Sequence, residues 1–284
     1  AVNKMDLVGY DKAVFDRITL AYRAFASEIG ITNFTAIPIS GFKGDNITAL
    51  SDNTPWFKGP GLVEHLETVE IGAPADEAKP FRLPVQWVNR PNLDFRGFSG
   101  QLASGKVKPG DAVRILPSGK ATTVDRIVTL DGDLGEAVAG QSVTLTLADE
   151  VDCSRGDVIA AADNPPEAAD QFEGTLVWMA DEAMIPGRAY WLKLATQGVS
   201  GTIQAPKYEI NVNTLDHLAA KTLELNGIGV VELSTDKPIT FEAYSDNRTL
   251  GGFILIDKLT NATVAAGMLH FSLRRAQNVH WQAT

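Results

Sequence analysis

The stretch Phe81-Arg82-Leu83-Pro84-Val85-Gln86-Trp87-Val88 marks the point at which the hydrophobic pattern of the chain changes from helical to strand-like. Phe81, Leu83, Val85 and Trp87 occupy alternate positions, which is the period of a strand with one buried face. Turn-forming residues then recur roughly every 8 to 12 residues, a spacing typical of an antiparallel barrel or sandwich. These turn signals are Pro91-Asn92, Lys108-Pro109-Gly110, Pro117-Ser118-Gly119, Asp131-Gly132 and Arg155-Gly156. We therefore predict an antiparallel β-barrel domain over residues 80–163.

Residues 171–274 repeat this pattern and predict a second antiparallel β-barrel domain. Its expected strands are Leu176–Met179, Tyr190–Leu194, Tyr208–Val212, Gly229–Leu233, Phe253–Ile256 and Val264–Phe271. Between the barrels, Asp163–Asp170 contains two prolines flanked by acidic residues, and we interpret it as an exposed linker. Residues 275–284 are expected to be a tail that either ends the protein or joins it to a further domain.

Residues 1–71 have a helical pattern instead. From Asp11 to Ile29, apolar side chains recur at spacings of three and four, which predicts an amphipathic helix that ends at Gly30. Phe34–Ile39 is then expected to be a short buried strand, and Pro60 is placed in the first turn of a second helix. Gly72–Pro80 has no apolar periodicity and is interpreted as a linker. The apolar stripe of the first helix consists of Val14, Ile18, Tyr22, Phe25 and Ile29.

Two loops of this segment have residues suited to recognising a purine base, Asn3-Lys4-Met5-Asp6 and Ile39-Ser40-Gly41-Phe42-Lys43. A carboxylate at Asp6 can accept hydrogen bonds from two adjacent donors, such as N1–H and the 2-amino group of guanine, which adenine lacks. Leaving such a buried carboxylate unpaired is costly, so it discriminates strongly between bases. Asn3 would bridge the loop to the base edge, and the stem of Lys4 would lie along the base plane.

The second loop would add a backbone donor. The turn at Ser40-Gly41 is expected at the carboxyl end of a strand, where ligands bind in open α/β sheets, and would bring an N–H group to the base carbonyl. Gly41 suits this close approach because it has no Cβ. Asp45-Asn46 and Asp52-Asn53 are interpreted only as turn formers.

No phosphate-binding sequence G-x-x-x-x-G-K-[ST] occurs in the 284 residues. Only Ala1 and Val2 precede Asn3, which is short for a central strand. We therefore interpret the chain as a fragment cut inside a nucleotide-binding domain. His65, His217, His270 and His280 show no metal-ligand spacing, and His217 is expected in a helical turn or loop, so we predict no metal site and no catalytic residue in this fragment.

Composition narrows the class of protein further. A formal charge of −10 and a pI near 4.9 disfavour a surface built to neutralise phosphates, so we expect no nucleic-acid partner. The single cysteine, Cys153, cannot form an internal disulfide and is expected to be buried, which fits a reducing compartment. No apolar run reaches the ~20 residues of a membrane span. Residues 1–284 contain no signal peptide, although a truncated start would hide one. We predict a cytoplasmic protein without a membrane partner.

The order of parts resembles the translational GTPase family, in which two β-barrel domains follow a P-loop GTPase domain. The resemblance implies an elongation factor Tu-like fold, in which residues 1–71 are an α/β remnant of the GTP-binding domain. Two longer stretches, residues 88–100 and 251–264, resemble the large, GTPase subunit of bacterial sulfate adenylyltransferase. They read Val88-Asn89-Arg90-Pro91-Asn92-Leu93-Asp94-Phe95-Arg96-Gly97-Phe98-Ser99-Gly100 and Gly251-Gly252-Phe253-Ile254-Leu255-Ile256-Asp257-Lys258-Leu259-Thr260-Asn261-Ala262-Thr263-Val264.

This resemblance implies a role in sulfate assimilation. The small catalytic subunit binds ATP and sulfate and forms adenosine 5′-phosphosulfate and pyrophosphate, while the large subunit hydrolyses GTP to drive that step. The residues that fall in the family's guanine-binding motifs are Asn3, Lys4, Asp6, Ser40, Gly41 and Phe42. The phosphate loop, the switch segments and the Mg²⁺ ligand would lie in the missing N-terminal part, so we expect the fragment alone to be inactive.

The alternative is a translation elongation factor-like GTPase that carries aminoacyl-tRNA on its barrels. The acidic net charge and the two longer stretches favour the sulfate adenylyltransferase subunit.

Overall fold

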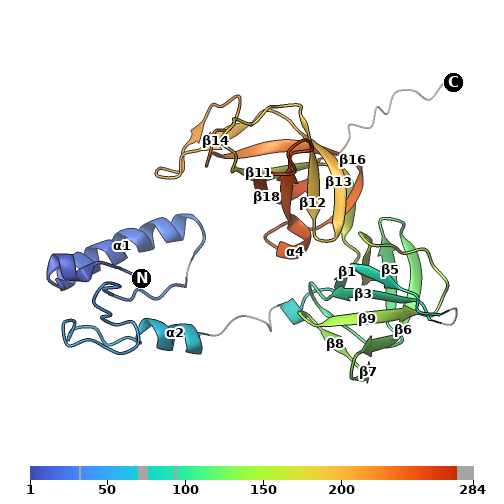
Figure 1. The fold of residues 1–284 in the computed structure, drawn as a ribbon, viewed down its shortest axis with the longest axis horizontal. Helices are drawn as coiled ribbons and strands as arrows, with labels where there is room; N and C mark the ends of the chain where they lie inside the picture. Colours follow the sequence, from blue (N-terminus) through green and yellow to red (C-terminus); the bar gives the residue numbers. More distant parts are fainter. Residues whose placement is uncertain (32, 70–75, 93–94, 274–284) are drawn as a thin grey trace. The chain divides into compact units, whose positions relative to one another are not determined.

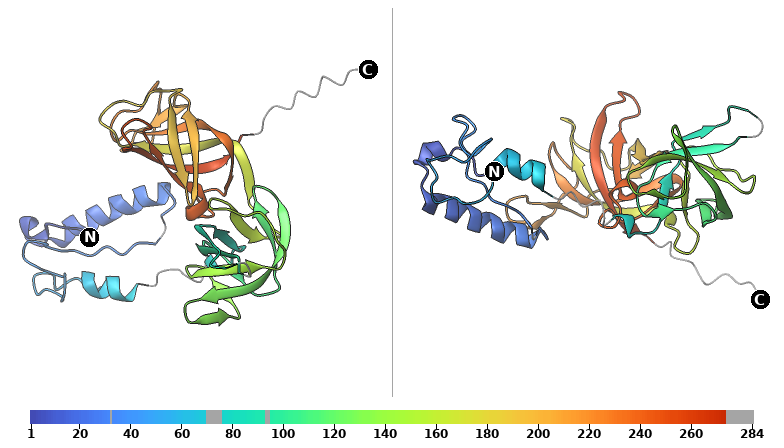
Figure 2. Two further views of the ribbon diagram at one scale, coloured as in Figure 1. Left: turned by 45° about the vertical axis from the view of Figure 1, so that its right-hand side comes forward. Right: turned by 90° about the horizontal axis from the view of Figure 1, so that it is seen from below.

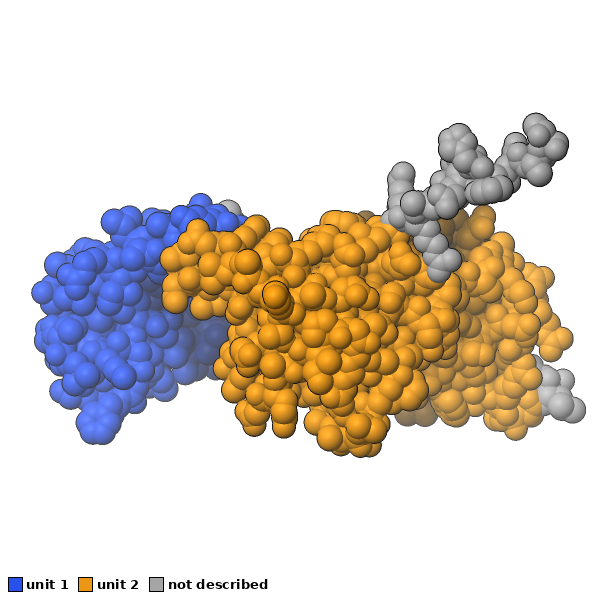
Figure 3. All heavy atoms as spheres, turned by 90° about the horizontal axis from the view of Figure 1, so that it is seen from above, with its two compact units in different colours: residues 1–71 blue, residues 72–284 orange. Residues whose placement is uncertain are grey.

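The computed structural model describes residues 1–31, 33–69, 76–92 and 95–273 (Figure 1). It contains two compact units, Ala1–Ile71 and Gly72–Thr284, which Figure 3 shows in separate colours. The second unit contains all of the β-strands described below. None of the helices in the described ranges is long and apolar enough to cross a membrane.

The first unit contains the 3₁₀ helix η1 (Met5–Val8) and the helices α1 (Lys12–Glu28) and α2 (Leu62–Thr68). The predicted first helix is confirmed, and Asp11 caps it by accepting a hydrogen bond from the Ala13 N–H at 2.7 Å. The predicted apolar stripe is only partly covered within this unit. Phe15 and Ala26 are the buried residues of α1, whereas Ile18, Tyr22 and Ile29 are 43 to 49% exposed.

Residues 34–39 do not form the predicted strand. Ile37 and Ile39 are buried, but only an isolated parallel bridge joins Val2 to Pro38. The Val2 N–H donates to the Ile37 carbonyl at 2.8 Å, and the Ile39 N–H donates to the Val2 carbonyl at 2.9 Å. Pro38 has no N–H to donate to a ladder, so this segment cannot pair as a regular central strand. The second helix also begins later than predicted, at Leu62, with Gly61 as its N-cap.

The first barrel lies between residues 82 and 161 and has the strand order β1-β10-β5-β6-β9-β3-β2. The segment Arg82–Asn89 closes it, because its first half pairs with β10 and its second half pairs with β3. Figure 2 shows the strands from two further sides. They are β1 (Arg82–Pro84), β2 (Trp87–Asn89), β3 (Gly97–Gln101), β4 (Lys106–Val107), β5 (Ala112–Leu116), β6 (Lys120–Thr129), β7 (Gly132–Leu134), β8 (Ala137–Val138), β9 (Ser142–Leu147) and β10 (Val158–Ala161).

The second barrel lies between residues 167 and 272. Its strand order is β11-β18-β17-β12-β13-β16-β14-β15, and β11 also pairs with β16, which closes the ring. The strands are β11 (Glu167–Trp178), β12 (Ala189–Leu194), β13 (Gln197–Ile203), β14 (Tyr208–Ile210), β15 (His217–Leu218), β16 (Ile228–Phe241), β17 (Gly252–Ile256) and β18 (Thr263–Ser272). A short helix, α4 (Arg248–Gly251), precedes β17.

The six predicted strands of this barrel are all present. The sequence interpretation missed β13, in which Gly198 and Gly201 interrupt the apolar alternation. His217 lies in β15 and not in a helical turn or loop, and its ring stacks on Tyr208 with the centroids 3.7 Å apart.

The predicted linker Asp163–Asp170 is shorter than expected. Glu167, Ala168 and Ala169 pair with Phe241, Thr240 and Ile239, so the strand begins directly after Pro165-Pro166. The prolines cannot pair, but they do not prevent pairing by the residues that follow them. A register shift between Ala169 and Gln171 lets the strand continue into the barrel wall. In the other expected linker, residues 72–75 lie outside the described residues, as does the tail at residues 275–284.

A buried ion pair connects the two barrels. Arg82 of β1 is 1% exposed, and its guanidinium donates to the Glu242 carboxylate oxygen Oε1 from Nε at 3.0 Å and from Nη2 at 2.7 Å. Its Nη1 donates to the Phe81 carbonyl at 2.9 Å. Oε2 of Glu242 accepts a hydrogen bond from the Asn247 side chain at 2.9 Å. The charged groups of both partners are therefore hydrogen-bonded, as buried charges must be.

We predict that Glu242→Ala destabilises the chain by about 3 kcal/mol, because it leaves the Arg82 guanidinium buried without its counter-charge. Urea unfolding followed by circular dichroism measures the change. Asp133→Ala is the matched control, since Asp133 forms a bidentate pair with Arg126 in which both side chains are about half exposed. Equal midpoints for the two variants would show that burial adds nothing to the Arg82 pair.

Candidate functional site

The two predicted base-recognition loops lie side by side in the first unit. Oδ1 of Asn3 accepts hydrogen bonds from the Lys4 N–H at 2.7 Å and from the Gly41 N–H at 3.0 Å. The Met5 N–H donates to the Ile39 carbonyl at 3.1 Å, and the Met5 side chain is buried. Asn3 thus holds together two turns that are 38 residues apart in sequence.

Asp6, in η1, is half-buried. Within the part of the chain that the structure describes, no group donates a hydrogen bond to its carboxylate, so both of its oxygens remain available as acceptors. Lys4 has a left-handed backbone conformation, with φ of 65°, and is exposed, as is Phe42 at 93%. The loop therefore presents an acceptor pair beside an exposed aliphatic stem and an exposed aromatic ring.

The turn at Ser40 and Gly41 is held by hydrogen bonds within the chain. The Ser40 side chain is fully buried, and its Oγ accepts a hydrogen bond from the Lys43 N–H at 3.2 Å. The Ser40 N–H donates to the backbone carbonyl of Asp45 at 3.3 Å, and the Gly41 N–H donates to Oδ1 of Asn3. Among the described residues, the Phe42 N–H is the donor of this turn that has no partner. A Cβ on Gly41 would lie 3.5 Å from Asn3 Oδ1, an ordinary contact, so packing within the chain does not require glycine.

A polar network behind this turn was not recognised in the sequence. The Asp45 carboxylate accepts hydrogen bonds from Tyr10 Oη at 2.5 Å, Ser51 Oγ at 2.6 Å and Asn53 Nδ2 at 3.1 Å. The Ser51 and Tyr10 hydroxyls lower the pKa of Asp45, and the bond to Asp45 raises the pKa of Tyr10 to about 12. These donors are spread over more than forty residues, so no local pattern in the sequence predicted the network.

Asn46 is also more than a turn former. It is fully buried, its Nδ2 donates to the Pro38 carbonyl at 2.7 Å and to Thr54 Oγ1 at 2.8 Å, and its Oδ1 accepts from the Ser51 N–H at 2.8 Å. Its φ of 55° lies in the left-handed region, which asparagine tolerates better than most residues. Asn46 and Asp45 therefore fix the turn that carries Gly41 and Phe42.

This arrangement of hydrogen-bond acceptors, a free N–H group and an exposed ring is suited to binding a ligand. Across the described ranges, no group of three or more His, Cys, Asp or Glu side chains could hold a metal ion. Cys153 is buried as predicted, and burial raises the pKa of its thiol to about 12, which disfavours the reactive thiolate.

Comparison with known proteins first defines the class. The family model "Elongation factor Tu domain 2" matches residues 99–160, and "GTP-eEF1A C-terminal domain-like" matches residues 171–270. The structure of Sup35 complexed with GMPPNP has a TM-score of 0.65 and 20% sequence identity, covering 96% of this chain and 68% of that chain. The two barrels are therefore those of the translational GTPase superfamily.

The proteins similar in sequence indicate a narrower group than the domain models do. The bifunctional enzyme NodQ of Rhizobium sp. (strain N33) is 53% identical over all of this chain and 44% of its own length. The bifunctional enzyme CysN/CysC of Xylella fastidiosa is 51% identical over 99% of this chain and 45% of its own length. Sulfate adenylyltransferase subunit 1 of Aeromonas hydrophila is 46% identical over all of this chain and 63% of its own length. Over its whole length the chain is therefore homologous to NodQ, CysN/CysC and sulfate adenylyltransferase subunit 1, and it spans about half the length of the curated relatives it matches.

We predict that Tyr10 titrates near pH 12, above the usual value of ~10, because ionisation would place a phenolate beside the Asp45 carboxylate. A raised pKa means that this contribution to stability is complete below pH ~10 and is lost as the pH rises toward 12. Absorbance titration at an alkaline-sensitive wavelength, with Tyr10→Phe subtracted, isolates this phenol. Asp45→Asn should return the pKa of Tyr10 toward 10. An unchanged titration in that variant would show that Asp45 does not raise the pKa of Tyr10.

Proposed function

We propose that this chain is part of the GTP-binding regulatory subunit of a sulfate adenylyltransferase. In this proposal, GTP hydrolysis is coupled to the formation of adenosine 5′-phosphosulfate and pyrophosphate from ATP and sulfate. The observation that carries the proposal is the hydrogen bond from Gly41 to Asn3, which unites the two guanine-recognition loops in a chain whose whole length is homologous to that family.

The described residues fit a guanine base. Asp6 has a half-buried carboxylate without a donor among the described residues, which suits N1–H and the 2-amino group of guanine. Asn3 would orient the turn at Gly41, and the N–H of Phe42 is a donor suited to the base carbonyl. Lys4 and Phe42 are exposed and could cover the base. When bound, GTP supplies a phosphoanhydride bond whose hydrolysis releases free energy for an unfavourable coupled step.

We propose that the longer protein, of which this chain is a part, binds the phosphates of GTP and Mg²⁺. Charge-assisted contacts to phosphates provide much of the affinity for a nucleotide. Because residues 1–284 contain no G-x-x-x-x-G-K-[ST] sequence, the phosphate loop and the Mg²⁺ ligand are expected in another part of the longer protein. We propose that the partner is the small catalytic subunit that binds ATP and sulfate. We also propose a cytoplasmic location, where these nucleotides are available.

The competing function is that of an elongation factor that carries aminoacyl-tRNA on the barrels. The family models that match the two barrels and the likeness of fold favour it. The net charge of −10 opposes it, because tRNA affinity depends on neutralising phosphates.

We predict that the full-length protein, mixed with the small subunit, releases pyrophosphate from ATP and sulfate faster with GTP than with a non-hydrolysable GTP analogue or with no guanine nucleotide. The reason is that only hydrolysis supplies free energy to adenylyl transfer. Coupled pyrophosphate detection measures the three rates, with the small subunit alone as the control. Equal rates under all three conditions, together with salt-sensitive binding of aminoacyl-tRNA, would favour the elongation factor instead.

We predict that Asp6→Asn in the full-length protein shifts the preference from GTP toward XTP. The substitution replaces one of two acceptors by a donor, which matches the additional carbonyl of xanthine better than the amino group of guanine. The ratio of kcat/KM for the two nucleotides should change by about 10²-fold or more. Asp16→Asn, an exposed carboxylate of α1 paired with Lys12, is the control and should leave the ratio unchanged. The same ratio in both variants would show that Asp6 does not contact the base.

A further inference from the structure

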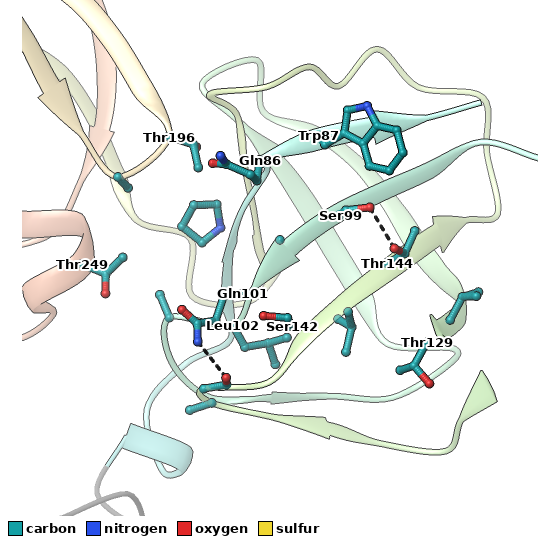
Figure 4. Close-up of a pocket in the computed structure, with 18 of the residues that line it drawn as sticks. Gln86, Trp87, Ser99, Gln101, Leu102, Thr129, Ser142, Thr144, Thr196 and Thr249 are labelled. Carbon is teal, nitrogen blue, oxygen red and sulfur yellow. Dashed lines mark hydrogen bonds between the residues drawn. The ribbon is translucent and has the colours of Figure 1, made fainter. Parts of the chain in front are cut away.

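A groove of about 1020 Å³ runs over the outer face of the first barrel and is also lined by Ala195, Thr196 and Thr249 of the second barrel (Figure 4). Its floor crosses four neighbouring strands, β2, β3, β9 and β6, and one row of directly paired residues runs across it. Trp87 pairs with Ser99, Ser99 pairs with Thr144, and Thr144 pairs with Val128. Trp87 is the one bulky side chain of this row, whereas Ser99, Thr144 and Val128 are small, so the floor is low between Trp87 and β6. We call this part of the groove the trough.

Exposed apolar side chains form the walls of this trough. Trp87 is 59% exposed on one side, and Leu130, which follows β6 on the other side, is fully exposed. Three strand spacings separate β2 from β6, a distance of about 14 Å. Large apolar side chains that border a groove in this way are typical anchors of protein–protein contacts.

The lining is nearly free of charge. Among the described residues that line the groove, Asp76 is the one charged side chain, and none is a lysine or arginine. A phosphate or nucleic-acid ligand requires cations, so this lining opposes both. The hydroxyls of Ser99 and Thr144 are hydrogen-bonded to each other at 2.8 Å, and Gln101 donates to the Gly140 carbonyl at 2.9 Å. These floor groups therefore tolerate an occupant that presents an apolar surface.

Backbone hydrogen bonding indicates whether the bound segment is an extended strand or a helix. The strands of the floor are paired with one another, so the face of the sheet has no row of free N–H and carbonyl groups for an extended peptide. An extended segment would leave its own backbone groups without partners, whereas a helix satisfies them internally. A helix with side chains is about 10–12 Å across, which fits a trough bounded by strands about 14 Å apart.

We propose that this trough binds one amphipathic helix of the second subunit, with the helix's apolar face between Trp87 and Leu130. This inference rests on the proposed function, because it assigns the contact surface for the partner of that enzyme. The recognition is of the helix-in-groove kind, in which apolar side chains three and four residues apart anchor the helix.

Titration calorimetry of the full-length protein with the purified second subunit tests the contact. Leu130→Asp should raise the Kd at least tenfold, because it places a carboxylate in an apolar contact, and Trp87→Ala should weaken binding as well. The matched control is Leu259→Asp, since Leu259 is 84% exposed on the second barrel and does not line the groove. It should change the Kd less than twofold. GTP turnover by the isolated subunit should be unchanged in all three variants.

Photo-cross-linking from position 130 then tests the form of the occupant. Cross-linked residues of the second subunit should be spaced three and four apart, whereas a spacing of two would overturn the helix. If the wild-type protein binds the second subunit but Leu130→Asp binds as tightly as Leu259→Asp, the trough is not the contact and the proposed function stands. If the wild-type protein does not bind the second subunit, the proposed function itself fails. Binding of tRNA that Leu130→Asp abolishes would also overturn this inference.

Discussion

A guanidinium that is almost completely withdrawn from water is the constraint on which the two-barrel unit depends. Arg82 can be buried at the start of the first barrel only because Glu242 of the second barrel supplies a carboxylate, 160 residues away in sequence. Asn247 holds the other oxygen of that carboxylate and also caps α4. The hydrophobic cluster continues across the same boundary, since Leu116, Val158 and Ala160 of the first barrel belong to the core of the second.

This connection affects what the first barrel can present to a partner. Arg82 begins the segment whose later residue, Trp87, forms one wall of the trough, and residues 195, 196 and 249 of the second barrel line the trough as well. The surface proposed for the partner therefore depends on both barrels, although its anchors lie on one. Polar side chains with several hydrogen bonds also stabilise the first unit. There, the buried amide of Asn46 and the carboxylate of Asp45 hold the turn beside the candidate guanine site.

Much of the fold was predictable because strands and helices impose local periods on the chain. The six strands expected in the second barrel are all present, and α1 lies within the predicted helical segment Asp11–Ile29. The errors lie where local signals conflict with pairing. Residues 167–169 were assigned to a linker from the neighbouring prolines and acids but pair with β16, while residues 34–39 are apolar but contain Pro38 and form only a bridge.

The sequence by itself determined the two-barrel architecture, the residue types of the two candidate base-recognition loops and the family resemblance, because each is encoded in a short run of neighbouring residues. Only the tertiary structure decided which polar groups are free and which are already paired. It buried Ser40, bonded Gly41 to Asn3, left Asp6 without a donor among the described residues, and aligned Trp87 with Val128 across four strands. The physical reason is that hydrogen-bond satisfaction and strand register depend on residues distant in sequence, which no local pattern encodes.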